Sequence, residues 1–308
     1  LNNMTVQEYL KEILKQQSLP SDSDEVEALR FERNKVDGLI RESFKESSIT
    51  IQYAGSYAKK TMIRDSYDLD IACYFNHDDE LPGKTLEEIF NSVKESLESG
   101  YYVVPKKSAI RLQSSDINPQ GIRIDFHIDV VPGRFTDDGK EEAFLYQSSR
   151  DKKRLKTNLK KHIEYIKESG LVNTIKLVKF WKKRIGLSNI KTFILELLVI
   201  ESLGKLKDSN GLDECLKKFW EQLRDNIKNL KIEDPANPTG NDLSDLFDES
   251  TKTALSAFAT SALTFIDNDN WESIFGKVES MSDDEKVASV GAAILLNPNR
   301  PKLWCDIT

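Results

Sequence analysis

The sequence predicts an α+β fold with two lobes, a mixed α/β lobe around a central sheet followed along the chain by a helical lobe. In the first half, short runs of β-branched and aromatic residues alternate with helical patterns, whereas from Lys152 onward the helical period dominates. The 308 residues, of which 39% are hydrophobic, suffice for one large globular unit or two packed domains. We therefore expect a mixed domain with N-terminal helices over residues 1–150, and a helical domain over residues 151–308 that closes a cleft against it.

The first elements are two helices. An amphipathic pattern covers Val6–Gln16, and after the break at Pro20 a longer pattern runs from residue 24 to residue 45. Ser23 or Asp22 can cap the longer helix, because a short polar side chain accepts a hydrogen bond from the first free N–H groups. Four strands and one helix are then expected, at Ile49–Ala54, Leu69–Phe75, Tyr101–Val104, Ala109–Gln113 and Thr85–Leu97.

A fifth strand is expected at Ile122–Val131, where apolar and polar side chains alternate strictly. Residues two apart on a strand share a face. We expect Pro132 to end this strand. One face carries Ile122, Ile124, Phe126 and Ile128, and the other carries Arg123, Asp125, His127 and Asp129.

The second half reads as a helical bundle interrupted by a turn-rich loop at residues 235–240. Residues 152–161 carry six basic side chains, which form either a solvated helix face or a phosphate-attracting wall. The expected helices are Lys152–Glu168, Val172–Ile185, Thr192–Leu206, Leu212–Ile227, Leu243–Phe247, Lys252–Ile266, Trp271–Ser280 and Asp283–Leu295.

Composition argues against several classes of protein. With 44 basic and 51 acidic residues, the formal charge of −7 disfavours general binding to nucleic acid, which needs a concentrated basic surface. The cysteines Cys73, Cys215 and Cys305 are isolated and odd in number, so we expect reduced thiols rather than a zinc site or disulfides. No apolar stretch is long enough to span a membrane, and no leader peptide is evident. We therefore expect a cytoplasmic protein.

Gly55-Ser56 follows the first expected strand. Glycine allows the backbone to approach a ligand closely, and a serine at a following helix start presents a hydroxyl and free N–H groups to phosphate oxygens. By itself the pair carries no weight, because many turns contain it.

Asp68-Leu69-Asp70 opens the second expected strand. Both carboxylates project from one face into one small volume, and two such charges stay ionised most easily around a cation. Taken alone, the pair is better explained as two solvated aspartates at a strand end.

A third acidic position lies on the strand at Ile122–Val131. Asp125 and Asp129 share a face but lie about 13 Å apart along a regular strand, so only one can join Asp68 and Asp70. We choose Asp129, because the Val-Val-Pro after it ends the strand. Together, the Gly-Ser loop and three aspartates predict a phosphoryl-transfer site with two metal ions, for which Mg²⁺ is suited and Mn²⁺ is an alternative.

These motifs resemble the polymerase-β-type nucleotidyltransferase superfamily, and more narrowly the branch with oligoadenylate synthetase, cyclic GMP-AMP synthase and the bacterial CD-NTases. The resemblance covers residues 45–280 and implies a polymerase-β-like catalytic lobe with a helical lobe that lines the donor pocket. The matching segments are Ala54–Thr61, Ser66–Ile71, Ile128–Pro132, Ile175–Lys182, Ile190–Glu196 and Asp234–Pro238.

The resemblance also implies roles for single residues. Gly55 and Ser56 would hold the donor triphosphate, and the metals would be bound by Asp68, Asp70 and Asp129. Lys179 would contact phosphate, with Lys176 one helical turn earlier. Thr192 stands where the family commonly has serine, and Phe193 would stack on a base. From the residues alone, the lysines are a wet helix face and Phe193 is a core aromatic.

The resemblance implies a synthase of cyclic di- or trinucleotides from nucleoside triphosphates, ATP among them, that serves CBASS anti-phage defence. Its effector would be reached through the product rather than by direct binding. Clustered Cys and His residues for a zinc insertion are missing, so we expect no duplex nucleic-acid activator. We also expect a monomer. Two alternatives remain open. One is a non-cyclising, template-independent transferase acting on RNA or another acceptor, and the other is a silent module that keeps only the fold.

Overall fold

The computed structural model describes residues 4–119, 121, 123–149, 153–188, 190–236, 243 and 248–278. By their contacts these form two compact units, which we name the helical unit (residues 4–18, 59–67 and 160–278) and the sheet unit (residues 19–58 and 68–159). This division differs from the single boundary expected at residue 150. The reason is apolar packing: Tyr9 and Leu10 near the N-terminus, and Ile63, are buried in the same core as the C-terminal helices.

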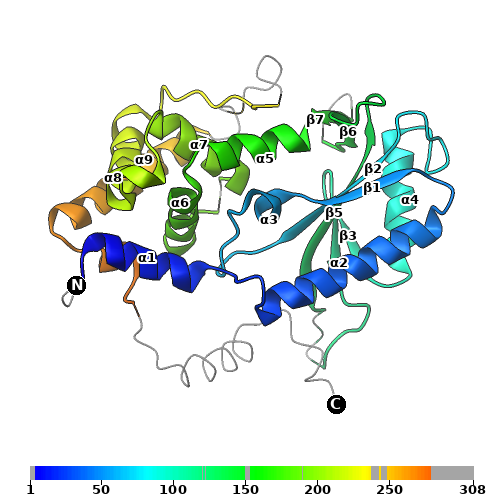
Figure 1. Cartoon of the computed structure of the whole chain (residues 1–308), viewed down its shortest axis with the longest axis horizontal. Helices are drawn as coiled ribbons and strands as arrows, with labels where there is room; N and C mark the ends of the chain where they lie inside the picture. Colours follow the sequence, from blue (N-terminus) through cyan, green and yellow to red (C-terminus); the bar gives the residue numbers. More distant parts are fainter. Residues whose placement is uncertain are drawn as a thin grey trace. The chain divides into compact units, whose positions relative to one another are not determined.

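The sheet unit is built on a mixed sheet, as expected. In the described residues this sheet has seven strands, in the order β1-β2-β5-β4-β3, with β6 paired to β5 and β7 paired to β6 (Figure 1). Strands β2 and β5 run parallel, and the other neighbouring pairs are antiparallel. The strands are β1 (Ile49–Tyr53), β2 (Leu69–Phe75), β3 (Tyr102–Pro105), β4 (Ile110–Gln113), β5 (Asp125–Phe135), β6 (Ala143–Tyr146) and β7 (Arg154–Thr157).

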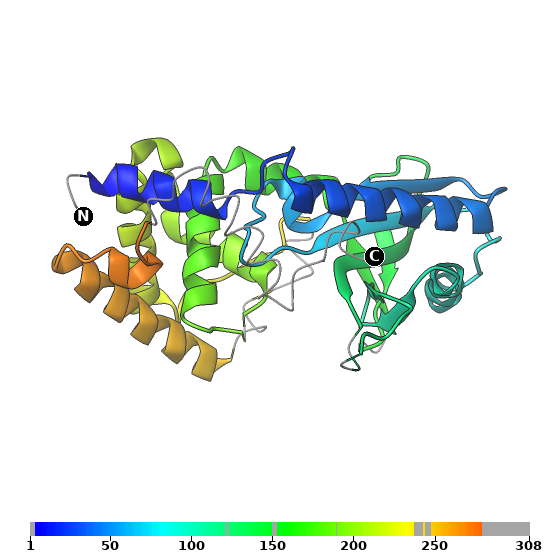
Figure 2. The same cartoon turned by 90° about the horizontal axis from the view of Figure 1, so that it is seen from below.

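Two helices pack on this sheet, α2 (Asp24–Ser43) and α4 (Leu86–Glu98), and both contact β5 and each other. Figure 2 shows α2 as the long blue helix beside the strands. Ser23 caps α2 by accepting a hydrogen bond from the N–H of Val26, and Thr85 and Glu88 form a capping box at the start of α4. The short helix α3 (Gly55–Lys59) follows β1.

Strand β5 departs from its predicted course. It begins at Asp125 and continues through Pro132 to Phe135, so the expectation that Pro132 ends it is wrong. Pairing with β4 stops at Val130 and pairing with β6 starts at Gly133, so Pro132 falls where that side of β5 has no described partner. Its missing N–H therefore interrupts no ladder there.

The predicted helix at Lys152–Glu168 is also wrong in its first part. Residues Arg154–Thr157 form β7, which pairs with β6, and the helix α5 covers only Leu159–Glu168. The basic run is thus divided between a strand and a helix. The four residues of β7 are too few to show a strand pattern beside the helical pattern that follows them. Their partner strand β6 was not predicted either.

The helical unit is a bundle around an apolar core. Its aromatic centre brings together Trp181, Trp220 and Phe275, with ring centroids 5.7 Å apart for the two tryptophans and 6.2 Å apart for Trp220 and Phe275. Its helices are α1 (Val6–Gln17), α5, α6 (Val172–Arg184), α7 (Thr192–Leu203), α8 (Leu212–Asn226), α9 (Glu249–Asp267) and α10 (Glu272–Phe275), with a 3₁₀ turn at Asp208–Asn210.

Some predicted elements lie wholly or partly outside the described residues. The helix at Asp283–Leu295, most of Leu243–Phe247, the end of Trp271–Ser280 and most of the loop at 235–240 lie outside the described residues. Leu243 itself is not helical. Cys73 and Cys215 are buried free thiols, as expected, and Cys305 lies outside the described residues.

Candidate active site

The candidate active site starts from the parallel pairing of β2 and β5. In this register Asp70 stands directly beside Asp129, with Leu69 beside Ile128 and Ile71 beside Val130. The apolar neighbours are buried and fix the register, because a shift by one residue would turn them out of the core. Asp68 precedes β2 by one residue. The structure therefore brings Asp68 and Asp70, at the start of β2, beside Asp129 in the interior of β5.

Gly55 lies against Asp70, where a side chain at position 55 would force the Asp70 side chain to move. Its φ is +56°, and a Cβ built on it would lie 1.7 Å from Oδ2 of Asp70. The backbone approach is held by a hydrogen bond of 2.8 Å from the N–H of Ala54 to the carbonyl of Asp70. The Gly-Ser motif is thus a steric complement of the Asp-x-Asp motif, with Ser56 in the first turn of α3.

We expect Gly55→Ala to destabilise the fold by at least about 1–3 kcal/mol, since the left-handed backbone and the clash with Asp70 both oppose a methyl group. Thermal or denaturant unfolding measures the loss. Gly38→Ala is the matched control: in α2 of the same unit, a Cβ at Gly38 meets nothing within 4 Å. That change should raise stability by about 0.5–1 kcal/mol. Equal stabilities for the two variants would contradict the proposed close approach.

Arg111 on β4 sits among the acidic side chains, a feature the sequence analysis missed. Its Nε and Nη2 donate to the two oxygens of Asp129 at 2.5 and 2.9 Å. The same guanidinium donates to Asp125 at 3.1 Å and to Asp68 at 3.2 Å. Arg111 lies opposite Asp129 in the antiparallel register of β4 and β5, so the alternation along β4 was the available signal.

Asp129 is held ionised by its neighbours. Burial by itself opposes ionisation, but the hydrogen bonds and charges of Arg111 and Lys106 outweigh it and lower the pKa of Asp129. Lys106 contributes a 2.9 Å hydrogen bond from Nζ to Oδ2. Asp129 is therefore a buried carboxylate with a fixed orientation.

A bulge at His127 overturns the spacing argument that separated Asp125 from Asp129. His127 has φ of +56°, and the pairing with β4 shifts there: Leu112 pairs with Ile128, but Gln113 pairs with Asp125. Both aspartates consequently reach the guanidinium of Arg111. The choice of Asp129 now rests on its register with Asp70 rather than on a strand end.

The expected metal site depends on the donor atoms that the fold brings together. Across the described part of the chain, no group of three or more His, Cys, Asp or Glu side chains is arranged to hold a metal ion. The carboxylates nevertheless converge on one cationic atom, since Nη2 of Arg111 lies within hydrogen-bond distance of both Asp68 and Asp129. Carboxylate oxygens are the donors that Mg²⁺ prefers. The residues therefore fit a divalent cation that would share Asp68 and Asp129 in place of the guanidinium.

The helical unit holds a second charged cluster, which is buried. Glu196, fully buried on α7, pairs with Lys59 and with Lys179, whose Nζ lies 3.4 Å from Oε1. Thr61 donates its hydroxyl to Glu196 at 2.5 Å, and the Thr61 carbonyl accepts from Lys179 at 2.6 Å. This network, which we name the Glu196 cluster, joins the segment after α3 to helices α6 and α7.

The Glu196 cluster shifts the protonation of its members. Burial lowers the pKa of Lys179 to about 8, against the attraction of Glu196. Burial opposes ionisation of Glu196 as well, but Lys59 and Lys179 more than compensate and its pKa is lowered. The sequence carried one signal of this cluster, a glutamate inside the apolar stretch Phe193–Ile200.

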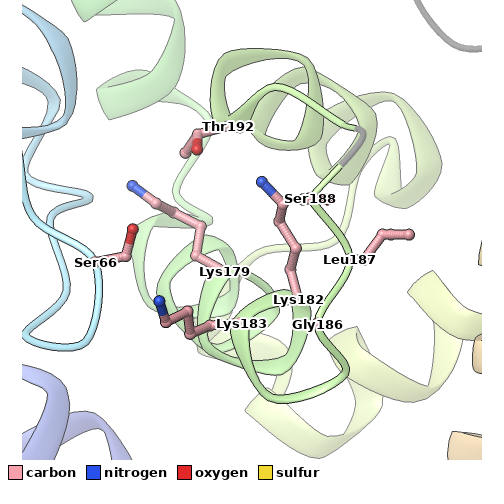
Figure 3. A pocket seen from close by; sticks show the side chains of 8 residues that line it. All are labelled: Ser66, Lys179, Lys182, Lys183, Gly186, Leu187, Ser188 and Thr192. Atoms are coloured by element: carbon pink, nitrogen blue, oxygen red, sulfur yellow. The ribbon is translucent and has the colours of Figure 1, made fainter.

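The remaining candidate residues lie near the Glu196 cluster in different settings. Thr192, at the first position of α7, lines a pocket together with Lys179 (Figure 3). Phe193 is half-buried, with its ring centroid 5.0 Å from Nζ of Lys59 and 4.9 Å from the ring of His162. Lys176 is half-buried on α6 and is not among the described residues that line the pocket.

Residues 4–169, more than half of the chain, match the family described as Second Messenger Oligonucleotide or Dinucleotide Synthetase domain, SMODS. The chain belongs to this family. The SMODS family membership confirms the resemblance to bacterial CD-NTases and makes the chain a nucleotidyltransferase that synthesises cyclic oligonucleotides.

Individual relatives are distant. The cyclic AMP-AMP-AMP synthase of Escherichia coli (strain MS 115-1) is 21% identical over 234 residues, which cover 72% of this chain and 71% of the relative. Among solved structures, the E. coli MS115-1 CdnC:HORMA-deltaN complex matches with a TM-score of 0.65 and 20% identity, over 89% of this chain and 98% of the other. The Bradyrhizobium diazoefficiens CD-NTase CdnG in complex with GTP matches with a TM-score of 0.67 and 16% identity, over 95% and 99%. These likenesses confirm the polymerase-β-like fold.

None of the helices among the described residues is both long and apolar enough to cross a membrane.

Proposed function

We propose that the protein uses Asp68, Asp70 and Asp129 to bind Mg²⁺, with Mn²⁺ as an alternative, and joins nucleoside triphosphates into a cyclic di- or trinucleotide. The observation that carries this proposal is the register of β2 and β5, which sets Asp70 beside Asp129 while Gly55 closes on Asp70. Carboxylates brought together in this way are suited to hold a divalent metal for phosphoryl transfer.

In the proposed reaction, a ribose hydroxyl oxygen of one nucleotide attacks the α-phosphorus of a nucleoside triphosphate. The new P–O bond forms as the bond to the β-phosphate oxygen breaks, pyrophosphate leaves with the electron pair, and the hydroxyl proton passes to solvent. Asp68, Asp70 and Asp129 would hold the metal, which when bound would lower the pKa of the hydroxyl and neutralise charge on the leaving group. Asp129, which Arg111 and Lys106 keep ionised, would provide a carboxylate ligand as the cation takes the place of the guanidinium. A second transfer within the linear product closes the ring.

The nucleotide-binding residues belong to this proposal as well. Gly55 and Ser56 would offer backbone N–H groups and a hydroxyl to the donor phosphates. Thr192 and Lys179 are supported by their place in the wall of one pocket, whereas the proposed phosphate contact of Lys176 rests on the family resemblance. Phe193 would stack on a base, which its half-buried ring permits.

The cellular role is inferred from the relatives. We infer that ATP is among the substrates, because the E. coli relative is a cyclic AMP-AMP-AMP synthase. A role in CBASS anti-phage defence, with an effector reached through the product, follows the resemblance to CD-NTases. We propose a cytoplasmic monomer. The absence of a duplex nucleic-acid activator agrees with the net charge of −7. The non-cyclising transferase is less well supported, since the curated relative makes a cyclic product.

The test is incubation of the purified protein with the four ribonucleoside triphosphates and Mg²⁺, followed by phosphatase treatment and mass spectrometry. We expect a phosphatase-resistant cyclic product that contains adenosine and that disappears with EDTA. Linear products alone, or labelling of added RNA, would favour the non-cyclising transferase. Failure to form any product with either metal would contradict the proposal.

A further inference from the structure

The guanidinium of Arg111 is shared among three carboxylates of the sheet unit. Nε and Nη2 donate to the two oxygens of Asp129, Nη2 also donates to Asp68, and Nη1 donates to Asp125. The Arg111 side chain is only 13% exposed, so it is largely enclosed by these partners. Three carboxylates this close repel one another unless a cation lies between them. One guanidinium thus holds together two proposed metal ligands, Asp68 and Asp129, and a third carboxylate that is not a proposed ligand.

The third carboxylate, Asp125, is held beside the guanidinium by the bulge in β5. Its Oδ1 accepts a hydrogen bond of 2.7 Å from the backbone N–H of His127, and its Oδ2 faces Nη1 of Arg111 at 3.1 Å. The left-handed backbone of His127 is uncommon for a residue other than glycine. Along a regular strand, Asp125 would lie about 13 Å from Asp129. The bulge therefore places Asp125 where it can retain the guanidinium without help from the other carboxylates.

A divalent cation and the guanidinium of Arg111 compete for the same oxygens. Nη2 lies 3.2 Å from Oδ2 of Asp68 and 2.9 Å from Oδ2 of Asp129, so a metal shared by these two aspartates must replace both contacts. The contact of Nη1 with Asp125 involves neither of them. Lys106, which also donates to Asp129, is 42% exposed, and its flexible side chain can turn into solvent. Arg111 has no such route, because it is enclosed.

We propose that Arg111 is a built-in counter-ion of the metal-free protein and that Asp125 is its receiving partner, both as positioning residues of the metal site. Without metal, Arg111 holds Asp68 and Asp129 close together. When a divalent cation binds, the guanidinium gives up these two aspartates and stays on Asp125. The metal affinity is then set by a competition between two cations, because the arrangement that binds metal is reached only when Arg111 withdraws. This inference rests on the proposed function, from which the metal site is taken.

The test is titration of the full chain with Mn²⁺ in the absence of nucleotide, with the free ion measured by electron paramagnetic resonance. Arg111→Gln should bind Mn²⁺ at least about tenfold more tightly than the wild type, since the competing cation is gone. Arg111→Lys keeps the charge but replaces the planar fork by one ammonium, so its affinity should lie between the two. In EDTA, Arg111→Gln should melt below the wild type, and added Mn²⁺ should raise its melting temperature by more.

Asp125→Asn tests the receiving partner. This variant should bind Mn²⁺ at least about threefold more weakly than the wild type, because the guanidinium then has no carboxylate to retain when it leaves Asp68 and Asp129. In the background of Arg111→Gln, the same change should leave the affinity within about twofold. This dependence on Arg111 separates a positioning role of Asp125 from direct coordination of the metal.

Arg41→Gln is the matched control. Arg41 also pairs with an aspartate, Asp37, but it lies on α2 with its side chain 52% exposed. Its loss removes the same charge and should leave Mn²⁺ affinity within about twofold. Mn²⁺ binding by Arg111→Gln that is no tighter than in the wild type, or an effect of Asp125→Asn that persists without Arg111, would overturn the inference. If instead Asp70→Asn bound Mn²⁺ as tightly as the wild type, the proposed metal site itself would be wrong.

Discussion

Asp70→Asn is expected to reduce formation of the cyclic product by at least about a hundredfold while leaving the fold intact, because the amide keeps the shape of the carboxylate but not its charge. Asp70 adjoins both Asp129 across the parallel strands and Gly55 across the turn, so its loss weakens the proposed metal site at its centre. Product yield by mass spectrometry at saturating Mg²⁺ measures the effect. Manganese binding, followed by the loss of the free Mn²⁺ signal in electron paramagnetic resonance, gives a readout independent of turnover.

Asp78→Asn provides the control for this loss. Asp78 follows β2 in the same unit, its side chain is 72% exposed, and it takes no part in the proposed site. The control should retain wild-type yield and Mn²⁺ binding. If Asp70→Asn still produced the cyclic product at the wild-type rate, Asp70 could not be a metal ligand, and the proposed carboxylate set would be wrong.

The second large effect concerns stability. Glu196→Gln should lower the free energy of unfolding by about 3–5 kcal/mol, because it leaves two buried ammonium groups without a counter-charge. Lys59 and Lys179 both face this carboxylate, whose side chain is fully buried. Chemical denaturation at neutral pH measures the loss. Glu201→Gln is the control on the same helix, since Glu201 is exposed and accepts only from the Tyr165 hydroxyl among the described contacts.

The difference between wild type and Glu196→Gln should depend on pH. The folded-state pKa of Glu196 lies below its ordinary value of 4.5, so its contribution is present above pH 4.5 and is lost as pH falls through the folded value. Lys179, with its pKa lowered from 10.5 to about 8, loses its proton more easily in the folded state, which relieves the variant at high pH. The stability difference should therefore be largest between these limits. A difference independent of pH would show that the buried charges are not its cause.

The aspartates were predictable from the sequence because two of them form a short motif, Asp-x-Asp, at the start of an expected strand. Asp68 and Asp70 lie two residues apart. Asp129 lies late in an expected strand whose other face is apolar. What the spacing could not provide was the pairing of β2 with β5, which alone decides that Asp70 meets Asp129. The family resemblance implied only that the three aspartates would bind the metals together.

Arg111 could not be placed from the sequence, because its role depends on a non-local pairing of β4 with β5 and on a bulge. The strict alternation from Ile122 predicted a regular strand, yet His127 adopts a left-handed backbone and draws Asp125 toward the same guanidinium as Asp129. A bulge of this kind leaves no periodic signature. The alternation therefore correctly placed Asp125 and Asp129 on one face of the strand, but the distance expected between them along a regular strand was wrong.

The lysines of α6 show a different limit. By their spacing, all of them fit a wet helix face. Only the structure shows that the Lys179 ammonium group is held in the Glu196 cluster, although Lys179 also lines the pocket with Lys182 and Lys183. The difference arises from Glu196, which lies on the neighbouring helix α7 and pairs with Lys179. The pattern of residues along α6 alone does not reveal this partner. Burial of a charge is decided by its partners.

The contact between Gly55 and Asp70 restricts how this protein can change by mutation. A side chain at position 55 would displace the carboxylate of Asp70, whereas Asp70→Asn leaves Gly55 in its place because the amide keeps the shape of the carboxylate. The restriction therefore acts in one direction: position 55 stays glycine for as long as the Asp70 carboxylate is needed. In a descendant of this chain, we expect substitution of Gly55 to follow the loss of Asp70 and not to precede it.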